Sequence, residues 1–68
     1  MPKSYSSREV IGFLKQDGWT LFNVEGSHHQ FKHQTKAGKV TVKDPQKDIP
    51  IGTLKSIEKR SGIKIRGR

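Results

Sequence analysis

The sequence contains no cysteine, which excludes disulfide bonds and any zinc site built from thiolates. A domain of 68 residues without either cross-link depends on well-formed secondary structure, or on a partner, for its stability. No apolar run approaches the roughly 20 residues of a membrane-spanning helix, and the N-terminal residues lack the apolar stretch of a secretion signal. We therefore expect one domain, residues 1–68, that resides in the cytoplasm and has no membrane partner.

Acidic residues are also scarce in this chain. There are 6 of them against 14 lysines and arginines, which gives a formal net charge of +8. This surplus favours a polyanionic partner, because cations that neutralise phosphates release condensed counterions. An anionic membrane, an acidic protein or a merely solvated surface would account for the same charge, so the charge alone does not select the partner.

The N-terminal part of the sequence has the pattern of a short helix. Ser6 and Glu9 have the spacing of a capping box, and Gly18 provides a residue that tolerates the left-handed conformation of a helix end. Between them an apolar stripe follows helical spacing: Val10, Phe13 and Leu14.

Three strands are predicted to follow this helix. Residues 19–24 are rich in aromatic and β-branched side chains, residues 28–34 form a second extended run, and residues 39–43 alternate polar and apolar positions. The segments 25–27 and 35–38 are interpreted as turns that join antiparallel neighbours.

A second helix is expected after Pro50, which suits a first helical turn, and Gly62 is expected to end it. Residues 63–66 are predicted either to dock as an extended tail or to form a fourth strand. The predicted stripe of this helix is Ile51, Leu54, Ile57 and Glu58. The order α-β-β-β-α predicts an α+β two-layer sandwich, with a three-stranded antiparallel sheet that carries both helices on one face. Double-stranded RNA-binding domains have the same layout, a resemblance at the level of the fold.

Strand alternation predicts which side chains lie on the open face of the sheet. Phe31 is the large apolar residue of the second strand and should face the helices, which turns His28 and its alternate neighbours outward. Val40 and Val42 point inward by the same argument. The expected open face therefore carries His28, Gln30, Lys32, Lys39, Thr41 and Lys43.

The three histidines, His28, His29 and His33, raise the possibilities of a metal site and of acid/base chemistry. Imidazoles on opposite faces of a flat strand cannot converge on one ion, so we expect no metal and no other cofactor. An outward imidazole among lysines has the groups that cleavage of RNA by its own 2′-hydroxyl requires: a proton-transfer group and cations that stabilise the phosphorane. The same pattern would also fit an ordinary polar surface.

The sequence Gly26-Ser27-His28-His29-Gln30-Phe31 resembles the signature of the HicA family of toxins. The similarity extends from about Ser6 to Ile63. It includes the glycine–aromatic exit of the first helix, the Val-Thr-Val strand, the Gly-Thr-Leu start of the second helix and the final Ser-Gly-Ile. One departure is Asp44, because many relatives have a histidine just before the proline of this loop.

The resemblance implies an endoribonuclease toxin of a type II toxin–antitoxin pair that cleaves mRNA and is neutralised by a HicB-like antitoxin. Its catalytic histidine would correspond to His28. We expect phosphate contacts from Gly26, Ser27, Lys32, Lys39, Lys43 and Lys47, a core position for Trp19, and an open-face position for Phe22 as a surface for a base or the antitoxin. The alternatives are a non-catalytic double-stranded-RNA-binding module of the same fold and a protein whose basic face binds an acidic partner.

Overall fold

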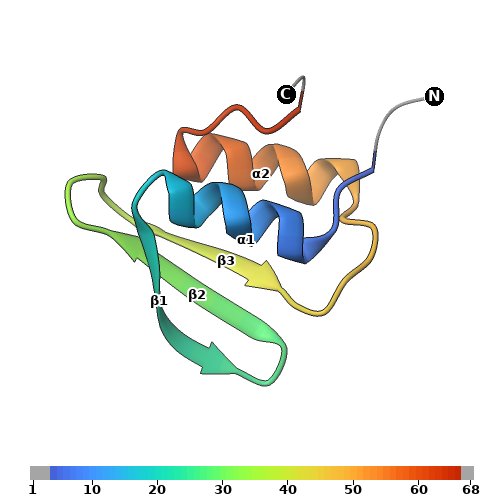
Figure 1. Ribbon diagram of the computed structural model, residues 1–68, viewed down its shortest axis with the longest axis horizontal. Coiled ribbons are helices and arrows are strands. Elements are labelled where there is room, and N and C mark those ends of the chain that lie inside the picture. The colour runs from blue at the N-terminus through green and yellow to red at the C-terminus, as the bar shows by residue number, and fades with distance from the viewer. Residues whose placement is uncertain (1–3, 67–68) are drawn as a thin grey trace.

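The computed structural model describes residues 4–66. Figure 1 shows the chain forming helix α1, three strands and helix α2 in that order. The elements are α1 (Ser7–Gln16), β1 (Trp19–Glu25), β2 (His28–His33), β3 (Lys39–Lys43) and α2 (Ile51–Ser61). The strands form one antiparallel sheet in the order β1-β2-β3, which confirms the predicted α+β class.

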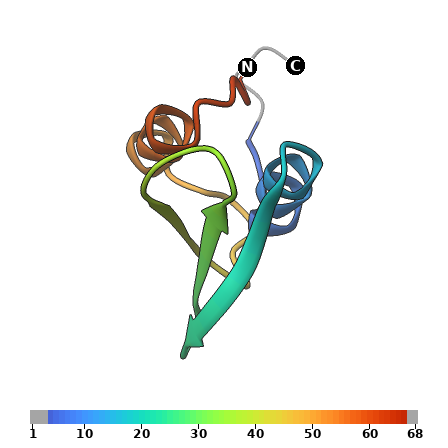
Figure 2. The ribbon, with the colours of Figure 1, turned by 90° about the vertical axis from the view of Figure 1, so that its left-hand side faces the viewer.

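The core lies between one face of the sheet and the two helices, which form the second layer (Figure 2). The alternation predicted for the second and third strands is correct, because Phe31, Val40 and Val42 are almost fully buried. In β1 only Trp19 is buried, and the inward Leu21 and Val24 are about half exposed. The buried strand residues pack against apolar residues of both helices. The buried cluster includes Trp19, Phe31, Val40 and Val42 from the sheet, Val10 and Leu14 from α1, and Leu54 and Ile57 from α2.

Helix α1 begins and ends as its sequence predicts. Ser6 accepts a hydrogen bond from the Glu9 amide, and the Glu9 carboxylate accepts one from the Ser6 amide, so the capping box is complete. Gly18 follows the helix with a φ of +101°, and a Cβ placed there would lie 2.9 Å from Nε2 of His33. Glycine is therefore required at the exit both for its backbone conformation and for the close approach of His33.

Strands β1 and β2 form a hairpin with a two-residue turn and one irregularity. Glu25 pairs with His28 across Gly26 and Ser27, and Gly26 has a φ of +59°. The register shifts between Leu21 and Asn23, which leaves Phe22 as the extra residue of a bulge. In both views the end of this hairpin projects beyond the helices (Figures 1 and 2).

In the second half of the chain, one detail differs from expectation, and one of the two alternatives for residues 63–66 is confirmed. Ile51 does not belong to the apolar stripe of α2, since it is 57% exposed and the core position before the helix is filled by Ile49. The amide of Ile49 donates to the carbonyl of Tyr5, which holds that segment against the start of the chain. Residues 63–66 form an extended tail whose Ile63 and Ile65 are buried, and no fourth strand forms within the described residues.

Glu58 of α2 anchors this tail. Its carboxylate accepts hydrogen bonds from the amides of Ile65 and Arg66, both at 2.8 Å, and pairs with Nε of Arg66. Burial raises the pKa of Glu58, but the hydrogen bonds from Arg66 and Ile65 outweigh it and hold the pKa below its ordinary value. The ionised carboxylate therefore stabilises the folded state.

We expect Glu58→Gln to lower the melting temperature at neutral pH by about 5 °C. The substitution weakens hydrogen bonds to a charged group, and in a small domain a small loss of stability shifts the melting temperature by several degrees. Since folding lowers this pKa, the contribution is complete at neutral pH and is lost as the pH falls below 4.5, the ordinary value. Melting curves from pH 3 to 7 should show a smaller acid-induced drop for the variant. The exposed Asp48→Asn is the matched control, and equal acid sensitivity of Glu58→Gln and the parent would contradict the assignment.

Candidate functional site

The open face of the sheet carries three cross-strand rows of polar side chains. Each row contains one residue from each strand, because β2 pairs with β1 on one side, across the bulge at Phe22, and with β3 on the other. The rows are Glu25–His28–Lys43, Asn23–Gln30–Thr41 and Thr20–Lys32–Lys39. The row Thr20–Lys32–Lys39 lies at the opposite end of the open face from His28, because Lys32 is about 13 Å further along β2.

His28 occupies the centre of the first row, at the projecting end of the hairpin. Its side chain is exposed and makes no hydrogen bond within residues 4–66. Glu25 faces it from β1 and Lys43 from β3. The position on the open face agrees with the prediction from strand alternation, and the imidazole is accessible to a ligand that lies across the sheet.

Glu25 is a member of this row that the sequence prediction missed. Alternation counted from the buried Trp19 would place residue 25 on the helix side of the sheet. The bulge at Phe22 reverses the alternation, so that Glu25 emerges on the open face. The sequence contained a signal for the pairing of Glu25 with His28, namely the Gly26-Ser27 pair between them. A two-residue hairpin turn that begins with glycine places its two flanking residues opposite each other.

Three of the four lysines predicted to contact phosphates lie on the open face, and the fourth, Lys47, does not. Lys32 and Lys39 are paired at one end of the open face, and Lys43 lies beside His28 at the other end. Nζ of Lys32 is 5.4 Å from the centre of the exposed Phe22 ring. Phe22 therefore occupies the expected face. Lys47 instead lies in the loop after β3, beside the first turn of α1.

Gly26 and Ser27 form the turn that precedes His28. Nothing lies within 4 Å of a Cβ placed on Gly26, so a ligand can approach its backbone closely. The carbonyl of Ser27 accepts a hydrogen bond from the amide of Asp44 at 2.8 Å. The turn is thereby fastened to the end of β3, and the hairpin end is held in place at the site.

His29 lies on the other side of β2 from His28 and has a positional role. Its Nδ1 donates to the carbonyl of Ser27 at 3.1 Å, and its Nε2 is 4.0 Å from the carboxylate of Asp44. Both contacts are local, and they fix the orientation of the His29 ring.

His33 is fixed even more tightly, at the far end of the strand. Its ring packs edge-on against Trp19, with the centroids 5.3 Å apart, and Nε2 donates to the carbonyl of Asp17 at 2.6 Å. Its Nδ1 accepts hydrogen bonds from the amides of Thr35 and Lys36. No cluster of three potential metal ligands occurs within the part of the chain that the structure describes.

Lys36 belongs to the same structural cluster and is not part of the open cationic face. Its ammonium pairs with the carboxylate of Asp17 and donates to the carbonyl of Ser61 at 3.0 Å. The hydrogen bond from Lys36 lowers the pKa of Asp17. These contacts fasten the β2–β3 loop to the ends of both helices.

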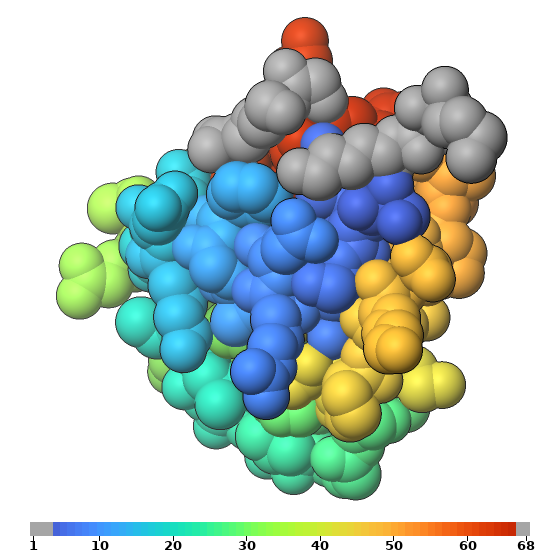
Figure 3. Space-filling view, turned by 45° about the vertical axis from the view of Figure 1, so that its right-hand side comes forward, coloured from blue at the N-terminus to red at the C-terminus, as the bar shows by residue number. Residues whose placement is uncertain are grey.

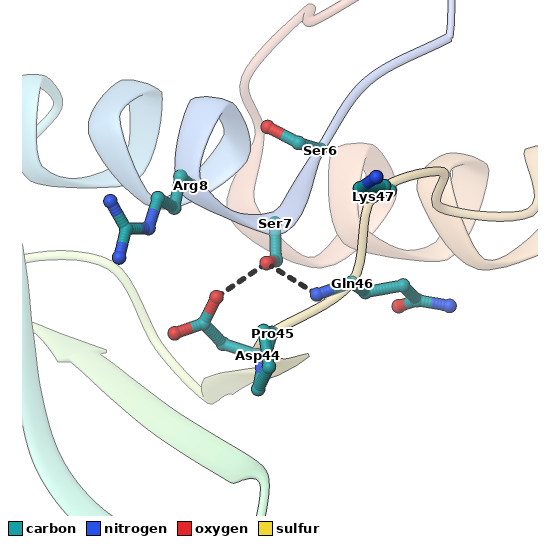
Figure 4. Close-up of a pocket in the computed structure, with 7 residues that line it drawn as sticks. All are labelled: Ser6, Ser7, Arg8, Asp44, Pro45, Gln46 and Lys47. Carbon is teal, nitrogen blue, oxygen red and sulfur yellow. Dashed lines mark hydrogen bonds between the residues drawn. The ribbon is translucent and has the colours of Figure 1, made fainter.

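A cleft of about 270 Å³ separates α1 from the loop after β3, and Asp44 lies at its base (Figure 4). The Ser7 hydroxyl donates to Asp44 at 2.5 Å and accepts from the amide of Gln46 at 3.0 Å. Figure 3 shows the first turn of α1 and this loop as adjoining surfaces. Asp44, the residue just before the proline of this loop, thus ties the loop to α1.

Comparison with known families agrees with this geometry. The model of the family described as the HicA toxin of bacterial toxin–antitoxin systems matches residues 7–63, which span all five elements. No curated protein gives a significant match. Within residues 4–66 there is no helix with the length and apolar character to cross a membrane. The match covers most of the sequence, and the chain therefore belongs to the HicA family of toxins.

Proposed function

We propose that this chain is an endoribonuclease that cleaves messenger RNA, and so blocks translation, by acid/base catalysis at His28 without a metal ion. HicA toxins are generally RNA-cleaving, which supports the class of reaction. The observation that carries the assignment is the exposed imidazole of His28 beside Lys43, on a face that also bears Lys32 and Lys39.

The chemistry proposed for this face follows from its charges. An imidazole can pass a proton to or from a ribose or leaving-group oxygen near neutral pH. Lysine ammonium groups stabilise the additional negative charge that develops on the phosphorus in the transition state. Lys43 is adjacent to His28 and serves this role, whereas Lys32 and Lys39 bind phosphates further along the RNA.

The remaining predicted residues are assigned supporting contacts. The open space at Gly26 admits a phosphate to the backbone, and the Ser27 hydroxyl provides a hydrogen-bond donor beside it. The exposed ring of Phe22 offers a stacking surface for an unpaired base. Lys47 contacts the RNA only if the strand continues past the end of β3 toward the cleft at α1.

We also propose that a HicB-like antitoxin neutralises the protein by covering this face. The basic surface favours an acidic partner. The exposed Leu21, Phe22 and Val24 of the edge strand β1 provide apolar contact area next to it.

The function is tested by incubating the purified protein with a long single-stranded RNA in excess EDTA. We expect the RNA to be cut, with a rate that EDTA does not change, because proton transfer by histidine requires no metal. A substrate with 2′-deoxyribose at every position is the control and should remain intact. Binding without cleavage would favour a non-catalytic RNA-binding module of the same fold, and cleavage only with added divalent metal would overturn the proposed mechanism.

A further inference from the structure

The row Glu25–His28–Lys43 places a carboxylate, an imidazole and an ammonium group side by side on the open face. Residues directly opposite one another in antiparallel strands have Cβ atoms about 5 Å apart. Both neighbours of His28 can therefore reach a single phosphodiester bound over the imidazole. The other polar rows of the face contain no carboxylate, so this is the place where an acid and a base are paired.

We propose that Glu25 is the second proton-transfer group of the site, the general base that complements His28 as the general acid. This inference rests on the proposed ribonuclease function and adds the residue that a two-proton reaction requires. A carboxylate is available as a base at neutral pH, and an imidazolium is an effective acid there.

Two structural features hold Glu25 in this position. The two-residue turn, with Gly26 at a φ of +59°, fixes the register in which residues 25 and 28 are opposite. The bulge at Phe22 turns Glu25 to the open face, where the Asn23 amide donates to its carboxylate at 3.4 Å. Bulges commonly re-aim side chains next to active sites.

The proposed step is a transesterification that balances without a co-reactant. The ribose 2′-oxygen attacks the adjacent phosphorus, and its proton passes to the Glu25 carboxylate. The bond from phosphorus to the 5′-oxygen breaks, and that oxygen takes the proton from the His28 imidazolium. Lys43 faces the non-bridging oxygens, and the products are a 2′,3′-cyclic phosphate and a 5′-hydroxyl. Exchange with water restores both groups.

The charges around this row allow a catalytic role to be distinguished from a bystander role. The titratable groups that face one another here are Glu25, His28 and Lys43, and the next charged groups on the face, Lys32 and Lys39, lie two rows away. A bystander carboxylate would only repel RNA phosphates, so its neutralisation would tighten binding and leave or raise the rate. If Glu25 is instead the general base, its neutralisation removes that base, and the cleavage rate falls even though RNA binding does not weaken.

The experiment measures single-turnover cleavage of an RNA oligonucleotide by the full chain and by Glu25→Gln over pH 3.5–9, together with RNA affinity. We expect the maximal rate of the variant to fall about 100-fold, a typical loss for one proton-transfer group, with affinity unchanged or tighter. The parent should show a bell-shaped profile, and the variant should lose the acidic limb. Asp48→Asn removes the same charge from an exposed loop position and should cleave like the parent.

The other possible results contradict either the role of Glu25 alone or the ribonuclease function as well. If Glu25→Gln cleaves as fast as the parent with both limbs of the profile intact, the role of Glu25 is wrong and the ribonuclease function stands. Parent cleavage without a 2′,3′-cyclic phosphate product would also overturn the role of Glu25. If the parent protein does not cleave RNA at any pH, both the inference and the proposed function fail. A melting curve of the variant that matches the parent ensures that a slower rate reports chemistry and not unfolding.

Discussion

Replacing His28 with alanine is expected to lower the rate of RNA cleavage by about 1,000-fold or more and to abolish growth arrest on expression. The imidazole is the proposed donor of the proton to the leaving oxygen, and general acid–base groups contribute about 10²- to 10⁴-fold each. Water can replace it only poorly at neutral pH. Single-turnover rates on a defined RNA and growth curves after induction measure the two effects.

The fold should survive this substitution. The His28 side chain is exposed and makes no hydrogen bond within the described residues, so its removal leaves no buried group without a partner. Circular dichroism and the melting temperature should match the parent. Gln30→Ala, on the same strand and face, is the control and should retain most of the cleavage activity. A His28→Ala protein that cleaves as fast as the parent would refute the assignment.

The local signals of this sequence were sufficient to predict the order and type of the elements. The capping box at Ser6, the alternation around Val40 and Val42, and the glycines at 18 and 62 each specify a backbone conformation through neighbouring residues. The face occupied by His28 followed from the single large apolar residue of its strand, Phe31.

What could not be predicted depends on contacts between distant segments. The bulge at Phe22 is a property of the pairing of β1 with β2, and it decides the face of Glu25. The burial of Ile49 in place of Ile51 depends on the hydrogen bond from Ile49 to Tyr5. The role of Asp44 depends on Ser7, 37 residues away in the sequence. A periodic pattern carries no information on such pairings.

These differences change the interpretation of Asp44. From the sequence it is only a departure from the histidine of many relatives. In the structure its carboxylate accepts a hydrogen bond from Ser7 and its amide donates to the carbonyl of Ser27. Asp44 thus connects α1 to the turn beside His28. In the proposed site Glu25 and His28 are the proton-transfer groups, and Asp44 has a positioning role.

Neutralising the three open-face lysines is expected to have the largest effect on RNA binding. A triple substitution of Lys32, Lys39 and Lys43 by glutamine removes the three proposed phosphate contacts, each worth about 0.7 in the slope of log affinity against log salt for a single strand. The slope should therefore become shallower by about 2, and binding should weaken most at low salt. Titrations of a fluorescent RNA at several salt concentrations measure both quantities.

The matched control replaces three exposed lysines of the helices, Lys15, Lys55 and Lys59, by glutamine. Both triple variants lose the same charge, so a difference between them reports the location of the cations and not the net charge. We expect the control to keep most of the parent's salt slope, because the helices lie on the far side of the sheet from the open face. If the two variants lose affinity equally, RNA does not bind preferentially to the open face. In that case His28, on that face, could not be placed at the scissile phosphate.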